Sequence, residues 1–176
     1  MIWESQLHRN IIQENINLYY DLIGKDLDIQ VKPYLRIVRP NAAQDNIGFH
    51  RDSFYGNSAY EISSFVPLTD LSEKSALMVE PESHKKPEIP YTKIVSQDVK
   101  KGDIKNQLGF LYEPKVIDKD YQIHAYPIPL QFGEILVLGL GTIHGQEVNS
   151  SDITRWSIDI RVKNSFAKTG TNPGYY

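Results

Sequence analysis

The segment 154–163 constrains the fold more than any other, because polar and apolar residues alternate along it. Side chains alternate between the two faces of a strand, so this segment predicts a strand with two unlike faces. The apolar face comprises Trp156, Ile158, Ile160 and Val162. The polar face comprises Arg155, Ser157, Asp159 and Arg161. We expect the apolar face to pack against a helix and the polar face to line the interior, where buried polar groups need a ligand to satisfy them.

Short β-rich runs separated by Pro, Gly, Asn and Asp begin at about residue 33. The predicted strands are 34–39, 47–52, 60–68, 76–80, 91–95, 121–127, 134–140, 143–148 and 154–163. Before them, apolar residues at helical spacing predict one amphipathic helix over about 4–22, ended near Gly24. One helix followed by many short strands predicts an all-β core, a sandwich or barrel of jelly-roll type.

The length of 176 residues predicts a single domain with a substantial core. Within this domain, 1–176, the β core would occupy about 33–163. The stretch 96–120 has the composition of a loop-rich insertion. The tail, 164–176, is polar, and we expect it to be either frayed or docked by its two terminal tyrosines.

A candidate metal site begins with His50 and Asp52, which are separated by one residue in the predicted strand 47–52. Two such residues point from the same face of a strand and can reach one point in space. A third ligand would have to come from elsewhere in the chain, and His144 is the obvious candidate. The pattern is common by itself, and structural hydrogen bonding is its simplest interpretation. The sequence has no cysteine, so a metal would depend on imidazole and carboxylate ligands, which favour a harder ion.

Several groups of residues give this pattern its context. In chain order they are His50-x-Asp52, 65–70, 76–84, 132–138, His144-Gly145 and Arg155-Trp156-Ser157. In order and spacing they resemble the phytanoyl-CoA dioxygenase branch of the iron(II)- and 2-oxoglutarate-dependent oxygenases. The resemblance covers about residues 34–162. Its specificity lies in the combination, since a distal His before a Gly, an Arg eleven residues later and a Ser two further rarely coincide.

The resemblance implies a double-stranded β-helix, a jelly roll like that of the cupins, and an oxygenase site inside it. His50, Asp52 and His144 would be the ligands of Fe(II), two His and one carboxylate. Arg155 would bind the distal carboxylate of 2-oxoglutarate through a bidentate salt bridge, and Ser157 would hydrogen-bond the same group. Phe65 would lie beside this cosubstrate. The expected activity is hydroxylation of a small molecule with O2.

The sequence departs from the family pattern at two turns. The family's Pro-Gly-Ser-His segment has Glu82 in place of its glycine, and its usual Gly-Asp is Gly133-Glu134. Asp52, in contrast, is intact. Related halogenases have a small residue there so that halide can bind, so an intact carboxylate favours hydroxylation over halogenation.

Other polar and aromatic residues have weaker functional interpretations. We expect His84 at a loop or rim, and His8 and His124 to be structural or exposed. Arg36 and Arg39 on the first strand could reach an anionic substrate or cosubstrate. Tyrosines that flank the site region and could stack on a substrate are Tyr34, Tyr55 and Tyr60.

Charge and hydropathy limit the partners. The net charge of −3 gives no electrostatic case for nucleic acid or an anionic membrane, and no stretch approaches the length of a membrane span. We therefore expect a cytoplasmic protein whose partners are a small-molecule substrate and O2. A sugar or sugar nucleotide is the first candidate substrate, followed by an amino-acid derivative or an acyl thioester. The sequence gives no oligomeric state.

Two other classes of function stay open. A cupin-like sugar epimerase or isomerase would use the same roll, although Arg155 and Ser157 then lack the cosubstrate that they are expected to bind. A non-catalytic carbohydrate-binding jelly roll would have no use for an intact set of three ligands.

Overall fold

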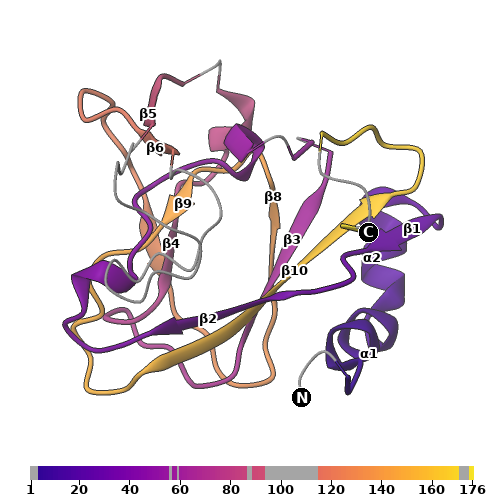
Figure 1. The fold of residues 1–176 in the computed structure, drawn as a ribbon, viewed down its shortest axis with the longest axis horizontal. Coiled ribbons are helices and arrows are strands. Elements are labelled where there is room, and N and C mark those ends of the chain that lie inside the picture. Colours follow the sequence, from indigo (N-terminus) through magenta and orange to yellow (C-terminus); the bar gives the residue numbers. More distant parts are fainter. Residues whose placement is uncertain (1–3, 56, 59, 87–88, 94–114, 171–174) are drawn as a thin grey trace.

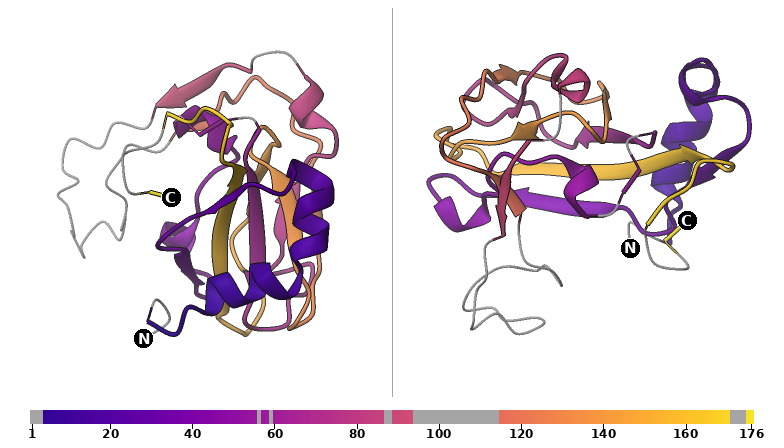
Figure 2. Two further views of the ribbon diagram at one scale, coloured as in Figure 1. Left: turned by 90° about the vertical axis from the view of Figure 1, so that its right-hand side faces the viewer. Right: turned by 90° about the horizontal axis from the view of Figure 1, so that it is seen from above.

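The computed structural model describes residues 4–55, 57–58, 60–86, 89–93, 115–170 and 175–176. In this part of the chain, two antiparallel sheets face each other and two short helices cover the outer face of the larger one (Figures 1 and 2). The larger sheet contains β1 (Leu27–Ile29), β2 (Tyr34–Val38), β3 (Ile62–Pro67), β8 (Leu136–Gly139) and β10 (Arg155–Asn164). The smaller sheet contains β4 (Leu77–Val79), β7 (Tyr126–Ile128) and β9 (His144–Gly145). A separate hairpin pairs β5 (Tyr91–Lys93) with β6 (Lys115–Ile117).

Strand β10 is the centre of the larger sheet. It pairs with β3 along one edge and with both β2 and β1 along the other, and β3 pairs in turn with β8. Apolar residues of β3 and β8 pack against the smaller sheet in a buried cluster. Its fully buried members are Phe65, Leu71, Leu77 and Val79. These two packed sheets form the expected jelly-roll core.

The two faces of β10 differ as predicted. Ile158, Ile160 and Val162 are completely buried against the helices, in a cluster that includes Ile12 and Tyr19. The opposite face is turned toward the smaller sheet and carries the buried polar residues. One member of the apolar face behaves differently, since Trp156 lies beyond the helices and stays 40% exposed.

The prediction of one N-terminal helix was wrong. The segment forms α1 (Leu7–Glu14) and α2 (Ile16–Ile23), separated by Asn15. The Asn15 side chain donates a hydrogen bond to the Ile11 carbonyl oxygen at 2.9 Å, and such local side-chain bonds compete with regular helix. Helix α2 ends at Gly24, as expected, where a φ of +88° suits glycine.

Several strand predictions need correction. The region 47–52 is not a strand, and β1 was not predicted. Strand β7 begins later than the predicted 121–127, and β6 lies inside the predicted insertion 96–120, most of which falls outside the described residues. Three short 3-10 helices add to the connections: η1 (Ala43–Asp45), η2 (Asp52–Tyr55) and η3 (Ser83–Lys85).

The last two residues are docked, which agrees with one of the two expectations for the tail. The Tyr175 carbonyl oxygen accepts a hydrogen bond from the Val31 amide at 2.9 Å, and the Tyr176 hydroxyl donates to Glu61 Oε2 at 2.5 Å. Among the described residues, no helix has the length and apolarity needed to cross a membrane.

Candidate metal centre

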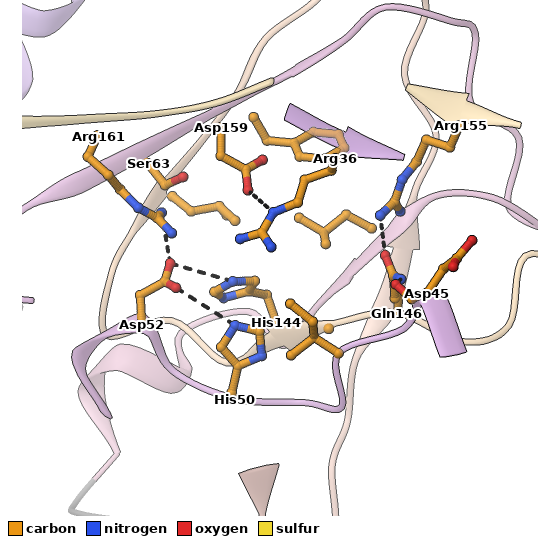
Figure 3. Close-up of a pocket in the computed structure, with 15 residues that line it drawn as sticks. Arg36, Asp45, His50, Asp52, Ser63, His144, Gln146, Arg155, Asp159 and Arg161 are labelled. Carbon is orange, nitrogen blue, oxygen red and sulfur yellow. Dashed lines mark hydrogen bonds and ion pairs between the residues drawn. The ribbon is translucent and has the colours of Figure 1, made fainter. Parts of the chain in front are cut away.

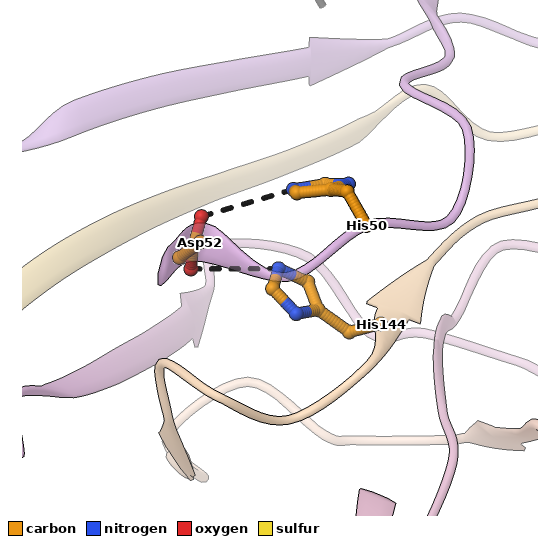
Figure 4. Close-up of side chains that lie close together, drawn as sticks. All are labelled: His50, Asp52 and His144. Carbon is orange, nitrogen blue, oxygen red and sulfur yellow. Dashed lines mark ion pairs between the residues drawn. The ribbon is translucent and has the colours of Figure 1, made fainter. Parts of the chain in front are cut away.

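His50 and His144 meet across an isolated antiparallel bridge. The His50 amide donates to the His144 carbonyl oxygen at 2.9 Å, and the His144 amide donates to the His50 carbonyl oxygen at 3.0 Å. The two imidazole rings lie 4.6 Å apart between centroids and point to the same side (Figure 4). A contact between residues 94 positions apart in the sequence therefore places two candidate ligands next to each other.

Asp52 reaches the same point by a different route from the predicted one. It does not follow His50 along a strand, because it starts the 3-10 helix η2. The chain turns after His50, and the Asp52 carboxylate faces both rings (Figure 4). Its Oδ1 lies 3.7 Å from Nε2 of His50, and its Oδ2 lies 3.6 Å from Nε2 of His144. The expectation that the three side chains converge holds, but the assumed strand was wrong.

Gly145 allows this close meeting of chain segments. A Cβ placed there would lie 2.8 Å from Cδ1 and 2.9 Å from Cα of Phe49, the residue before His50. A backbone atom at that distance cannot move aside without displacing the segment that carries His50. The smallness of Gly145 is thus a packing requirement of the pair of histidines.

Backbone carbonyl groups fix the tautomer of both histidines. Nδ1 of His50 lies 2.7 Å from the Gly48 carbonyl oxygen, and Nδ1 of His144 lies 3.0 Å from that of Thr142. A carbonyl oxygen only accepts, so Nδ1 carries the hydrogen in each neutral ring and Nε2 keeps its lone pair. This is the way that metal-binding histidines are oriented.

The three groups are buried and differ in charge. Burial lowers the pKa of His144 to about 4, so its imidazole is neutral near pH 7. Burial alone would raise the pKa of Asp52, but Arg161 and then the two histidines outweigh it and hold that pKa well below its usual range. The ionised carboxylate of Asp52 and the Nε2 lone pair of neutral His144 both offer acceptor atoms. The ligand atoms lie within 4.8 Å of each other, an arrangement that suits a metal ion.

Ser83 supports the strand that carries His144. Its hydroxyl donates to the Glu80 carbonyl oxygen at 2.7 Å and accepts from the Ile143 amide at 2.7 Å. Ser83 belongs to the segment 81–84, in which Glu82 lies where the resemblance predicts a glycine. The φ of Glu82 is +58°, in the left-handed region that favours glycine.

Arg155 lies at the other end of the pocket from Asp52 (Figure 3). Its guanidinium donates to the Ser75 carbonyl oxygen at 3.1 Å and to Oε1 of Gln146, and burial lowers its pKa to about 10. The Phe65 ring centroid lies 5.6 Å from Cζ of Arg155, within range of a cation–π interaction. Phe65 also lines the pocket, so the structure brings these two predicted residues together.

Ser157 lies on the same face of β10 as Arg155 and is completely buried. It is not among the residues that line the pocket. Its Oγ and the Nε of Arg155 have no hydrogen-bond partner within the described part of the chain. A buried polar atom without a partner is costly, so both atoms suit a polar ligand at this end of the pocket.

Two ion pairs also contribute to the pocket wall, beside apolar residues such as Leu77 and Leu138. Arg36 Nε lies 2.9 Å from Asp159 Oδ2, and Arg161 Nη1 lies 2.8 Å from Asp52 Oδ2 (Figure 3). Arg39, in contrast, turns outward and pairs with Asp45 at 2.7 Å. Of the two first-strand arginines considered from the sequence, only Arg36 lines the pocket.

The remaining histidines stay away from the cluster. His84 and His124 are exposed, and His8 is buried in α1 beneath the sheet. Sequence reasoning missed Gln146 as a pocket residue. It follows His144 by two positions, so the period-2 rule for strands could have identified it.

A scan of the sequence against protein-family models finds no match, and a search of curated proteins finds none either. Solved structures do match in fold. The non-heme monooxygenase ThoJ, in its apo form, is 20% identical with a TM-score of 0.64, over 92% of this chain and 60% of its own. EvdO2 from Micromonospora carbonacea var. aurantiaca, complexed with 2-oxoglutarate, is 17% identical with a TM-score of 0.61. The match covers 90% of this chain and 60% of EvdO2. The epimerase SnoN, in complex with Fe3+, alpha ketoglutarate and nogalamycin RO, is 19% identical with a TM-score of 0.61. The match covers 88% of this chain and 57% of SnoN.

At these identities the likeness shows a common fold, which confirms the predicted jelly-roll core. This chain spans about 60% of the length of ThoJ and EvdO2.

Proposed function

We propose that this protein is an Fe(II)- and 2-oxoglutarate-dependent dioxygenase that hydroxylates a small molecule. The observation that carries the proposal is the convergence of the Nε2 atoms of His50 and His144 on an ionised carboxylate inside a jelly roll, with each Nδ1 facing a backbone carbonyl oxygen. Two His and one carboxylate with open positions are typical of non-haem Fe(II) oxygenases. The fold neighbours support the proposal, since they include a non-heme monooxygenase and a 2-oxoglutarate complex.

In this proposal His50, Asp52 and His144 hold the iron. The carbonyl groups that fix Nδ1 of each ring set the ligand orientation before the metal arrives. The chemistry that bound iron and 2-oxoglutarate supply is the coupling of 2-oxoglutarate decarboxylation to C–H hydroxylation, with O2 consumed and succinate and CO2 released.

Arg155 and Ser157 would bind the distal carboxylate of 2-oxoglutarate, with Phe65 beside it. The guanidinium is buried, charged and already oriented by Ser75 and Gln146. A carboxylate would give partners to the Arg155 Nε and Ser157 Oγ atoms. The buried aromatic ring would limit where the carbon chain of the cosubstrate lies and would exclude water from the salt bridge.

The first candidate substrate is a sugar or sugar nucleotide. The pocket wall supports a polar substrate, because charged side chains such as Arg36 and Asp159 line it beside the metal ligands. Membership of the phytanoyl-CoA dioxygenase-like branch belongs to this proposal as well, since it rests on the sequence motifs.

A sugar epimerase is the second candidate, and one comparison favours it. SnoN is described as an epimerase and was solved with alpha ketoglutarate. The sequence argument that an anchor for 2-oxoglutarate disfavours an epimerase therefore does not hold. The two candidates differ in the product and not in the cosubstrate.

Mass spectrometry of the products separates them. Candidate sugar nucleotides are incubated with protein, Fe(II) and 2-oxoglutarate, with and without O2. A hydroxylase gives succinate and a product heavier by one oxygen atom, and an epimerase gives a product of unchanged mass. Conversion at full rate without O2 and 2-oxoglutarate would overturn the oxygenase assignment.

A further inference from the structure

Arg161 is a buried cation that directly contacts a candidate metal ligand. It lies on the inward face of β10, six residues after Arg155, and is only 4% exposed. Its Nη1 lies 2.8 Å from Oδ2 of Asp52, whose side chain is 6% exposed (Figure 3). A pair this well shielded from water is a fixed part of the site.

The two oxygens of Asp52 have different surroundings. Oδ2 lies 2.8 Å from Nη1 of Arg161 and 3.6 Å from Nε2 of His144, whereas Oδ1 lies 3.7 Å from Nε2 of His50. Both oxygens therefore face a candidate ligand, but only Oδ2 has the Arg161 cation in ion-pair contact. Because the guanidinium is always charged, this asymmetry persists over the whole physiological pH range.

Arg161 is itself held from several sides. Its backbone amide donates to Oε1 of the buried Gln30 at 3.0 Å, and its carbonyl oxygen accepts from the Gln30 amide at 2.9 Å. On the side chain, the Tyr175 hydroxyl hydrogen-bonds the guanidinium. Strand pairing with β3 fixes the register, since Arg161 lies opposite Ser63. The guanidinium is thus placed before any metal binds.

We propose that Arg161 is a positioning residue that keeps Asp52 a monodentate ligand. Carboxylates bind metals through one oxygen or through both, and the second mode occupies an additional coordination position. Two histidines and a monodentate carboxylate leave three positions of a six-coordinate ion open, whereas a bidentate carboxylate leaves two. This inference rests on the proposed metal site, where bidentate 2-oxoglutarate needs two positions and the reaction needs a third.

The proposal has a second consequence. A fixed cation beside the carboxylate reduces the negative charge that the metal experiences. Removing Arg161 should therefore leave metal affinity unchanged or raise it, while 2-oxoglutarate binds the resulting complex less well. A merely structural residue would behave differently, because its loss would weaken both.

The test counts water molecules bound to Mn(II) alone, by proton relaxation and by the effect of 17O-labelled water on the EPR spectrum. The wild type should show three bound waters, and Arg161→Met should show two. In Arg161→Met, 2-oxoglutarate should bind the Mn(II) complex about 10-fold more weakly, or about 1.4 kcal/mol, because a bidentate Asp52 leaves only two of the three positions open. Arg161→Lys, which keeps a cation, should restore the third water.

Lys163→Met is the matched control, because Lys163 is a buried cation two residues further along the same face and pairs with Asp28 at 2.6 Å. It should keep three waters. If Arg161→Met does not fold, Arg161→Gln replaces it, and Mn(II) in that variant should also bind two water molecules. Two waters in the wild type, or three in both uncharged Arg161 variants, would overturn the proposal. Absence of Mn(II) binding in the wild type would instead overturn the metal site and the proposed function.

Discussion

The two faces of β10 make different demands on the same ten residues. The outer face buries aliphatic side chains against α1 and α2, and nothing there needs a ligand. The inner face buries Arg155 and Arg161, leaves Asp159 half-buried, and places all three at the wall of the pocket. Burial of apolar surface stabilises a fold, whereas buried charge costs free energy unless partners compensate for it.

The difference between the two faces suggests that the outer face serves stability and the inner face serves the proposed function. A fold that needed only a core could place apolar side chains on both faces of β10, and replacing buried ion pairs by apolar residues is often neutral or stabilising. In the proposed function, the inner face retains charged residues because they take part in binding the metal and 2-oxoglutarate. Changes to the outer face should therefore affect folding, and changes to the inner face should affect ligands.

The largest expected effect on folding comes from the outer face. Ile160→Ala removes a completely buried side chain from the helix–sheet cluster and should cost about 2–5 kcal/mol of unfolding free energy. Metal affinity of the folded fraction should not change, because Ile160 points away from the site. Urea unfolding and Mn(II) titration measure the two quantities. A folded variant with greatly reduced Mn(II) affinity would show that the faces are not independent.

Acidification should destabilise the metal-free protein through His144, which lies on β9 and lines the pocket opposite the inner face of β10. The pKa of His144 is about 4 in the fold and 6.5 in the unfolded chain, so the unfolded state binds more protons between these values. Stability therefore falls as pH decreases from about 6.5 to 4, by about 3 kcal/mol from this residue. His8, whose pKa burial also lowers, adds to the trend.

Urea unfolding at several pH values, with a chelator present, measures this dependence. His144→Gln should flatten the curve most between pH 5 and 6.5, leaving the part due to His8 and, toward pH 4, the part due to carboxyl groups whose pKa the fold lowers, such as Asp52. An equally steep curve in His144→Gln would mean that other groups cause the loss.

Much of the fold could be predicted from local patterns. Alternation along β10 and helical spacing near the N-terminus each reflect neighbours in the sequence. The structure confirms the strand and the helical character of the N-terminal segment, but it divides the one predicted helix into two. The break at Asn15 was missed because spacing alone does not reveal the side-chain bond to Ile11. Strand β6 was missed because three residues are too few to show an alternating pattern.

The site could be predicted in its residue types but not in its geometry. The residues His50, Asp52 and His144 were recognised from their order in the chain. Their meeting depends on a single bridge between distant segments and on a 3-10 turn, neither of which has a local signature. For the same reason Arg161 was recognised as a polar interior residue, while its contact with Asp52 was not.

On the inner face, Arg155→Lys should weaken 2-oxoglutarate binding by about 1.5–3 kcal/mol, the value of a hydrogen bond to a charged group. Lysine keeps the charge but cannot make two parallel hydrogen bonds to a carboxylate. Mn(II) affinity should stay the same. Calorimetry with 2-oxoglutarate and the Mn(II) protein measures the loss. Equal cosubstrate affinity in both proteins would assign Arg155 a structural role with Gln146 and Ser75.

The smallest effect is expected at a turn that belongs to neither face. Glu82→Gly should relieve the strain of a side chain at φ +58°, whereas Glu82→Ala keeps the strain and loses the same exposed contact with Lys85. The glycine variant should be more stable than the alanine variant by about 1 kcal/mol. Thermal unfolding compares them. An alanine variant of equal stability would show that this backbone conformation is not strained.

The central claim is that the pocket between His50, Asp52 and His144 and the inner face of β10 binds a metal and 2-oxoglutarate together. The most direct measurement is anaerobic calorimetry of 2-oxoglutarate binding with and without Mn(II), in the wild type and in His144→Ala. We expect tight binding only to the wild type with metal, because the cosubstrate would contact both the ion and Arg155. Binding that is equally strong without Mn(II), or unchanged in His144→Ala, would contradict the account.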